Sequence, residues 1–128
     1  WAHQPFSLLP IPGQPRAPTH QSSNPSILYI ARDIANVHNA LLRDLNAIYL
    51  QHSSVYTPTD ISDLTFYIKA WGDAVQHHHH GEETVLFPTY DAMAEEVGEK
   101  DSVMGRNVEQ HRLFEPGFVK MMEYIEEV

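Results

Sequence analysis

The stretch that decides the fold runs from Gln76 to Pro88 and reads QHHHHGEETVLFP. It sets four consecutive histidines one glycine ahead of two glutamates, in a segment that otherwise has the apolar spacing of an amphipathic helix. Steps of three and four residues define its apolar seam: Leu64, Ile68, Trp71, Val75, His78, Glu82 and then Val85 or Leu86. Two polar residues, His78 and Glu82, thus take positions that the pattern assigns to a core.

Residues four apart on a helix project side by side, with roughly 6 Å between Cβ atoms, so His78 and Glu82 can reach one ion. A buried carboxylate without a partner is costly, and a metal ion removes that cost. In the alternative interpretation, the histidines face solvent and Glu82 pairs with a lysine or arginine. This segment alone leaves both open.

Composition excludes several classes of function. The chain has 128 residues, which suits one domain, and its formal net charge of -9 argues against nucleic acid or an anionic membrane as partner. It has no cysteine, so disulfides, thiolate metal sites and cysteine nucleophiles are excluded. The sequence has no apolar run of about 18 residues and no visible signal peptide, so we predict a cytoplasmic protein.

Prolines divide the chain into two parts. Six of the nine prolines lie in the first 25 residues, so we predict a Pro-rich extended arm or linker over residues 1–24 and a helical domain over residues 25–128. Phe6, Leu8, Leu9 and Ile11 predict that the start of the arm packs onto the domain, and residues 13–23 are expected to be a linker.

The first predicted helix starts at Asn24, a good N-cap followed by Pro25, and runs to about Gln51. Its seam is Ile27, Ala31, Ile34, His38, Leu41, Leu45 and Ile48. The second helix begins near Asp60, and Pro88 predicts a kink or break near Phe87 before the helix resumes toward Val97. Gly98 is expected to stop the helix at its C-terminal end.

The third predicted helix is capped by Ser102 and continues to about Glu126. Its seam is Met104, Val108, His111, Glu115, Phe118, Met122 and Ile125. Pro116 should bend this helix beside Glu115, which is therefore either a ligand or an exposed residue of the bend.

Each of the three seams is interrupted by histidine, or by histidine and glutamate, near its middle. Together these residues predict a metal site made of His38, His78, Glu82, His111 and Glu115. A mixed nitrogen and oxygen donor set suits iron, manganese or zinc, and bridging carboxylates in a helical bundle favour a dinuclear iron centre.

The blocks VHNALLRDLNAIYLQ, HHHHGEETVLFP and NVEQHRLF resemble the hemerythrin-like, HHE cation-binding family, and the opening WAHQPFSLLPIP resembles the leader of its fungal members. The resemblance implies an all-α, up-down antiparallel helical bundle with a non-haem di-iron centre. It also implies ligand roles for His38, His78, Glu82 and His111. His79 and Glu83 match less directly, as a second ligand or as groups that support the ligands.

The resemblance is incomplete at the C-terminal end. The family's fourth helix, with a further histidine and carboxylate, has no counterpart before Val128, so we expect a truncated domain, a partial site, or completion by a homodimer or a second chain. Glu115 also stands where oxygen-carrying hemerythrins have a histidine, which argues against reversible oxygen transport.

Three functional hypotheses follow. The first is a di-iron module that binds or senses oxygen or oxidants, or handles iron, with zinc or manganese as alternative metals. The second is a di-iron oxidoreductase, peroxidase-like or oxygenase-like, that acts on O2 or peroxide. The third is a metal-free helical interaction module. The sequence leaves open whether the protein is an enzyme.

Overall fold

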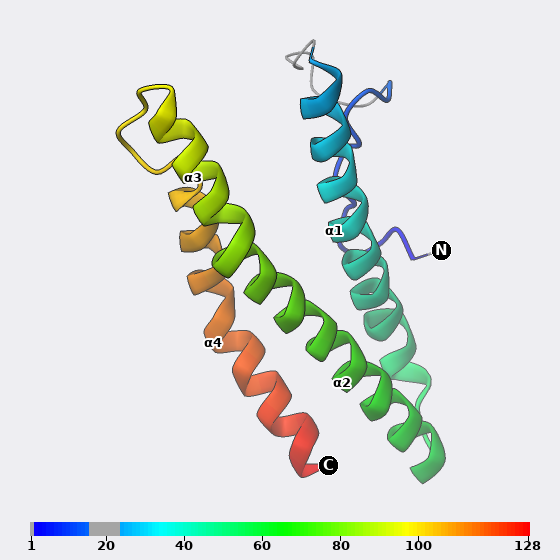
Figure 1. Cartoon of the computed structure of the whole chain (residues 1–128). Coiled ribbons are helices and arrows are strands. Elements are labelled where there is room, and N and C mark those ends of the chain that lie inside the picture. The colour runs from blue at the N-terminus through cyan, green and yellow to red at the C-terminus, as the bar shows by residue number, and fades with distance from the viewer. Residues whose placement is uncertain (1, 16–23) are drawn as a thin grey trace. The chain divides into compact units, whose positions relative to one another are not determined.

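The computed structural model describes residues 2–15 and 24–128, and within them it contains helices and no strand (Figure 1). The elements are α1 (Pro25–Gln51), a 3₁₀ turn (His52–Ser54), α2 (Pro58–Gly81), a π-helical turn (Glu82–Leu86), α3 (Phe87–Glu96) and α4 (Gly105–Glu127). The prediction of an all-α fold with three long helical segments is confirmed. The chain divides into two compact units, Trp1–Leu64 and Thr65–Val128, each described by itself below.

In the first unit, α1 begins where the sequence predicts. The Asn24 side chain accepts a hydrogen bond from the Ser26 N–H at 2.9 Å, and Pro25 occupies the first turn, where a missing N–H is harmless. The helix ends at Gln51, also as predicted.

The face of α1 that is most deeply buried differs from the predicted seam. Asn39 and Asn46 are 1% and 0% exposed, whereas Ile27 on the predicted seam is 53% exposed. The asparagines are buried because they bind the backbone of the N-terminal arm, residues 2–14, at Leu9 and Phe6. The arm therefore packs onto the domain as predicted, but polar side chains of α1 hold it. The predicted linker at residues 13–23 lies mostly outside the described residues.

Helix α2 begins at Pro58, two residues before the predicted start. Thr57 and Asp60 form a reciprocal capping box: the Asp60 N–H donates to Thr57 Oγ1, and the Thr57 N–H donates to Asp60 Oδ2, both at 3.1 Å. These hydrogen bonds lower the pKa of Asp60. The box satisfies donors that the first turn of the helix leaves open, which explains the earlier start.

The predicted break at Pro88 is a π-helical turn. Proline has no N–H, and its ring in a regular α-helix would meet the carbonyl of Thr84, four residues back. The chain instead widens over Glu82–Leu86, and the Phe87 N–H donates to the Glu82 carbonyl, five residues back. Figure 1 shows the ribbon continuing from α2 through this turn into α3.

The extra residue of the π turn changes the apolar seam. The sequence predicts that Val85 or Leu86 continues it, but Val85 is 65% exposed and Phe87 is 4% exposed. Each α-helical residue turns the chain by about 100°, so one added residue moves the next apolar side chain onto the core face. Phe87 is therefore the core residue that follows Glu82.

Hydrogen bonds fix both ends of the loop between α3 and α4. Gly98, with a φ of 96°, ends α3 as predicted: its N–H donates to the Glu95 carbonyl at 3.0 Å, and the Glu99 N–H donates to the Ala94 carbonyl at 3.1 Å. Helix α4 starts at Gly105 and not directly after Ser102, so the predicted cap is wrong.

The side chain that closes the start of α4 comes from α3. Asp91 accepts hydrogen bonds from the Ser102 hydroxyl at 2.7 Å and from the Met104 N–H at 3.1 Å. The first of these is the main cause of a lowered pKa for Asp91. A tertiary carboxylate thus takes the place of a local N-cap.

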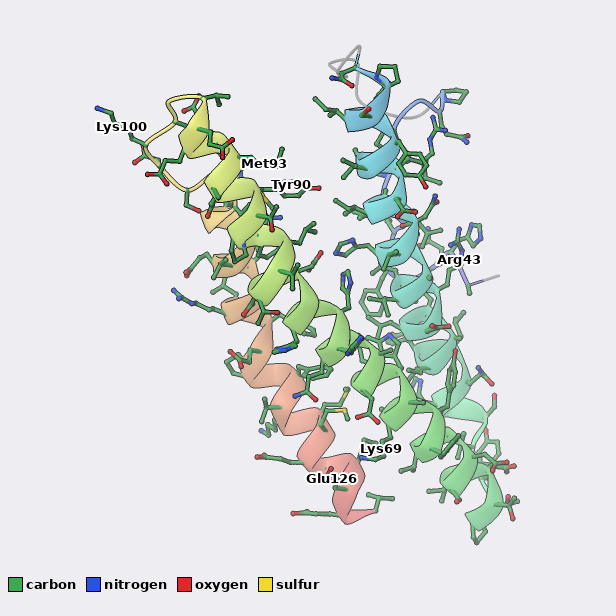
Figure 2. All side chains as sticks on the ribbon, in the orientation of Figure 1. Arg43, Lys69, Tyr90, Met93, Lys100 and Glu126 are labelled. Atoms are coloured by element: carbon green, nitrogen blue, oxygen red, sulfur yellow. The ribbon has the colours of Figure 1, made fainter. Side chains whose placement is uncertain are left out.

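In the second unit, α4 runs antiparallel to α2 and α3 (Figure 1). Lys69 on α2 approaches Glu126 near the C-terminus at 3.4 Å (Figure 2). Trp71, 7% exposed, packs edge-on against Phe118 with ring centroids 6.2 Å apart. Gly72 allows close approach, since a Cβ there would lie 2.2 Å from the Met122 sulfur. The hairpin brings the histidines of α2 level with His111 of α4.

Candidate metal centre

Glu82 is the buried acid at the centre of the second unit. It is the first residue of the π turn and is 7% exposed. Its Oε1 lies 3.4 Å from Nε2 of His78, one turn earlier on α2. The predicted neighbourhood of His78 and Glu82 is therefore present, and neither side chain faces open solvent.

His111 reaches the same carboxylate from α4. Its Nε2 lies 3.3 Å from Glu82 Oε2, and its Nδ1–H donates to Glu83 Oε1 at 2.8 Å. A carboxylate that accepts from Nδ1 fixes the ring orientation and leaves the Nε2 lone pair directed at Glu82. The two consecutive glutamates therefore contact different nitrogens of one imidazole.

His79 completes a cluster of three donors. Its ring stacks on His111 with centroids 4.0 Å apart and an interplanar angle of 20°. One donor atom each from His79, Glu82 and His111 lies within 4.8 Å of the other two. His79, which the resemblance matched less directly, is thus brought into the same cluster as Glu82 and His111.

The donor set fits a metal ion. With ligand bonds of about 2.0–2.2 Å, two neighbouring donor atoms on one ion lie roughly 2.8–3.6 Å apart in octahedral or tetrahedral geometry. The separations from Glu82 to His78 and to His111, 3.4 and 3.3 Å, match that range. Moreover, each oxygen of Glu82 faces a different imidazole, which is the arrangement of a bridging carboxylate.

The other predicted ligands are His38 and Glu115. His38 belongs to the first unit, where its half-buried ring hydrogen-bonds through Nδ1 to the Ile34 carbonyl at 2.9 Å. Glu115 is exposed, and α4 continues through Pro116. Its role as a ligand stays a prediction. Within the described residues, the remaining two histidines of the run, His77 and His80, are exposed and belong to no candidate donor cluster.

Two aromatic residues beside the cluster were not predicted from the sequence. Phe87 lies with its ring centroid 5.5 Å from that of His111, and Phe114 meets His79 edge-on at 5.5 Å. The π turn places Phe87 there, and the signal that could have revealed it is Pro88. Each ring thus covers one side of an imidazole of the cluster.

A pocket of about 320 Å³ opens beside the cluster within the second unit. Its lining combines His79, Glu83 and His111 with the apolar side chains of Val108 and Phe114. The pocket gives a small molecule a route to the stacked histidines.

The comparisons with known proteins agree with this cluster. Residues 30–128 match the family model described as the Hemerythrin HHE cation binding domain. A relative from Cryptosporiopsis sp. (strain 8999), the dimeric xanthone biosynthesis cluster protein R11, is 33% identical over 115 residues. The match covers 90% of this chain and 42% of the relative, so the chain spans about two fifths of the relative's length. No solved structure matches the chain.

The match to the family model includes every histidine and glutamate of the cluster. In the described residues, no helix is long and apolar enough to cross a membrane. The buried Glu82, the imidazoles around it and the extent of the match lead to one conclusion: the chain belongs to the hemerythrin HHE cation-binding domain family.

Proposed function

We propose that this HHE domain holds two iron ions at the Glu82 cluster and binds or senses oxygen or oxidants, or handles iron. The observation that supports two ions is the position of Glu82, whose oxygens lie 3.4 Å from His78 and 3.3 Å from His111. One carboxylate between two imidazoles can bridge a pair of ions. When bound, a di-iron centre supplies reversible redox chemistry toward oxygen and peroxide.

The residues of the chain have distinct roles in this proposal. His78 would serve one ion, His79 and His111 the other, and Glu82 both. Glu83 orients His111 through the hydrogen bond to Nδ1 and raises the basicity of the ring.

His38 is proposed as a further ligand from α1. Its Nδ1–H donates to the Ile34 carbonyl, so the ligand atom would be Nε2. Glu115, on the wall of the pocket beside the cluster, is proposed as a carboxylate that joins on metal binding. Zinc and manganese fit the same donors and are the alternatives to iron.

Metal content tests the proposal. Protein purified without a nickel column and loaded anaerobically with ferrous iron should contain about two irons per chain by elemental analysis. Glu82→Gln should lose both ions because the bridge is gone, and His111→Ala should lose at least one. His77→Ala is the matched control: it removes an exposed histidine from the same run and should leave the metal content unchanged.

A metal-free parent with native helix content would refute the metal site and leave a helical interaction module. Equal loss of metal in His77→Ala and Glu82→Gln would place the site elsewhere in the histidine run. Binding of one ion per chain would refute the bridging role of Glu82.

A second candidate function is a di-iron oxidoreductase that turns over peroxide or oxygen. The pocket of about 320 Å³ beside His79 and His111 favours it, because turnover needs a path for a small molecule. The relative's name places that protein in a dimeric xanthone biosynthesis cluster, so biosynthesis of small molecules is a setting in which such an activity could serve. Catalytic consumption of peroxide by the iron-loaded parent, absent in Glu82→Gln, separates this candidate from a binding or sensing role.

A further inference from the structure

Three polar side chains on one face of α1 hold the N-terminal arm. Arg32, Asn39 and Asn46 are spaced seven residues apart, and each hydrogen-bonds to backbone of the arm. The arm runs antiparallel to α1: Phe6 lies at Asn46, Leu9 at Asn39 and Pro12 at Arg32. We call these three residues the heptad ladder.

Each asparagine side chain hydrogen-bonds to both the backbone N–H and the backbone carbonyl of one arm residue. Asn39 Oδ1 accepts from the Leu9 N–H at 2.7 Å, and its Nδ2 donates to the Leu9 carbonyl at 3.0 Å. Asn46 treats Phe6 in the same way, at 2.8 and 2.9 Å, and also donates to the Ala2 carbonyl at 3.1 Å. This is the two-bond pattern by which a neighbouring β-strand recognises a residue.

The spacing explains why the pattern repeats. Seven helical residues rise about 10.5 Å along the axis, and three residues of extended chain span roughly 9–10 Å. A heptad on the helix therefore meets every third residue of an extended segment. Phe6, Leu9 and Pro12 are three apart, so each contacts one residue of the ladder.

The heptad ladder binds the backbone of the arm more than the arm's side chains. Phe6 and Leu9 remain 41% and 43% exposed although their amides are bound. None of the arm's prolines stands where an N–H is required, because the Pro12 position uses only the carbonyl, which accepts from Arg32 Nε at 3.3 Å. A proline-containing segment is thus compatible with the ladder if the first two of its three contacting residues have an N–H.

A turn marks the end of the recognised segment. The Gln14 N–H donates to the Ile11 carbonyl at 3.1 Å, and Gly13 takes a φ of 83°. A Cβ on Gly13 would lie 2.6 Å from an Arg32 guanidinium nitrogen. The Pro12–Gly13 turn therefore fits against Arg32 only with glycine at that position.

We propose that the heptad ladder is a peptide-binding site for an extended, proline-containing segment, and that the chain's own arm is the ligand it holds. Because the site reads backbone groups at a fixed period, it also accepts the same arm sequence as a separate peptide.

The test uses the full chain with its own arm released. Phe6→Pro with Leu9→Pro removes the two N–H donors that the asparagines bind and leaves α1 unchanged. A fluorescent peptide of residues 1–15 should bind this double variant, as measured by anisotropy. It should bind the parent at least about tenfold more weakly, because the tethered arm competes at an effective concentration near millimolar.

Two controls identify the site. Asn39→Leu with Asn46→Leu, added to the double variant, should abolish binding, and a peptide with proline at positions 6 and 9 should not bind. Unchanged binding after loss of the asparagines would overturn the proposal. So would absence of binding to a double variant whose helix content by circular dichroism equals that of the parent.

Hydrogen exchange gives a second test if the proline variant does not fold. The Phe6 and Leu9 amides should be protected in the parent chain and should lose protection in Asn39→Leu with Asn46→Leu. Equal exchange rates in the two proteins would overturn the proposal.

Discussion

Replacement of Asn46 by alanine tests how strongly the arm is held. Asn46 makes three hydrogen bonds to the arm, at 2.8, 2.9 and 3.1 Å, and is 0% exposed. A hydrogen bond of this kind contributes about 1 kcal/mol net, so three contribute about 3 kcal/mol. Alanine returns about 0.6 kcal/mol through its better helix propensity. Asn46→Ala should therefore lower the free energy of unfolding by about 2–2.5 kcal/mol.

Two other asparagines of α1 provide an internal scale. Asn39 makes two such bonds, so Asn39→Ala should lower the free energy of unfolding by about 1.4 kcal/mol by the same reasoning. Asn36 is exposed, and Asn36→Ala should raise the free energy of unfolding by about 0.6 kcal/mol through helix propensity alone. Urea unfolding followed by far-ultraviolet circular dichroism measures all three at one temperature.

The order of the three variants is the decisive result. If Asn46→Ala raised the free energy of unfolding as much as Asn36→Ala does, the hydrogen bonds to the arm would contribute nothing. The account of the buried asparagine face would then be refuted. A larger loss in Asn39→Ala than in Asn46→Ala would contradict the bond count.

Three further predictions concern the second unit. Hydrogen bonding lowers the pKa of Asp91, so its stabilising effect is complete above the ordinary value near 3.8 and is lost as pH falls through the lower folded pKa. Asp91→Asn should accordingly lower the Tm at neutral pH, and the two Tm curves should converge in acid. Gly72→Ala should destabilise by about 1–3 kcal/mol in urea unfolding because its Cβ would overlap the Met122 sulfur, and Met122→Ala should relieve most of the loss. Glu83→Gln should weaken iron binding about 10–100-fold in chelator competition while saturating at the parent's metal content, since it orients a ligand and binds no ion in the proposal. Loss of iron at saturation would make Glu83 a direct ligand.

Much of the fold could be predicted because its signals are local. The cap at Asn24 and the stop at Gly98 are properties of a few neighbouring residues, and both are present in the structure. The pairing of His78 with Glu82 follows from helical spacing in the same way. From the sequence, His111 could be placed beside His78 and Glu82 only by assuming that the polar positions of the two seams lie at the same height along paired helices.

The rest depended on contacts between distant residues. Nothing local in α1 indicates that Asn39 and Asn46 would be its most buried polar residues, since their partners lie 30 and 40 residues earlier in the chain. The start of α4 was misplaced for the same reason, because Asp91 on another helix supplies its cap. The bond between Glu83 and His111 likewise needs the hairpin to form first.

The π turn at Glu82–Leu86 sets the rotational phase of everything that follows it in the hairpin. One extra residue rotates the side chains that follow it by about 100° about the helix axis. With that rotation, Phe87 faces His111 and Asp91 faces the start of α4. Thr84 and Val85 are exposed and would tolerate many substitutions by side chain alone. The number of residues between Glu82 and Phe87 is a stricter constraint than their identity. Deletion of one of them would keep a helix and still turn Phe87 and Asp91 away from the partners they now contact.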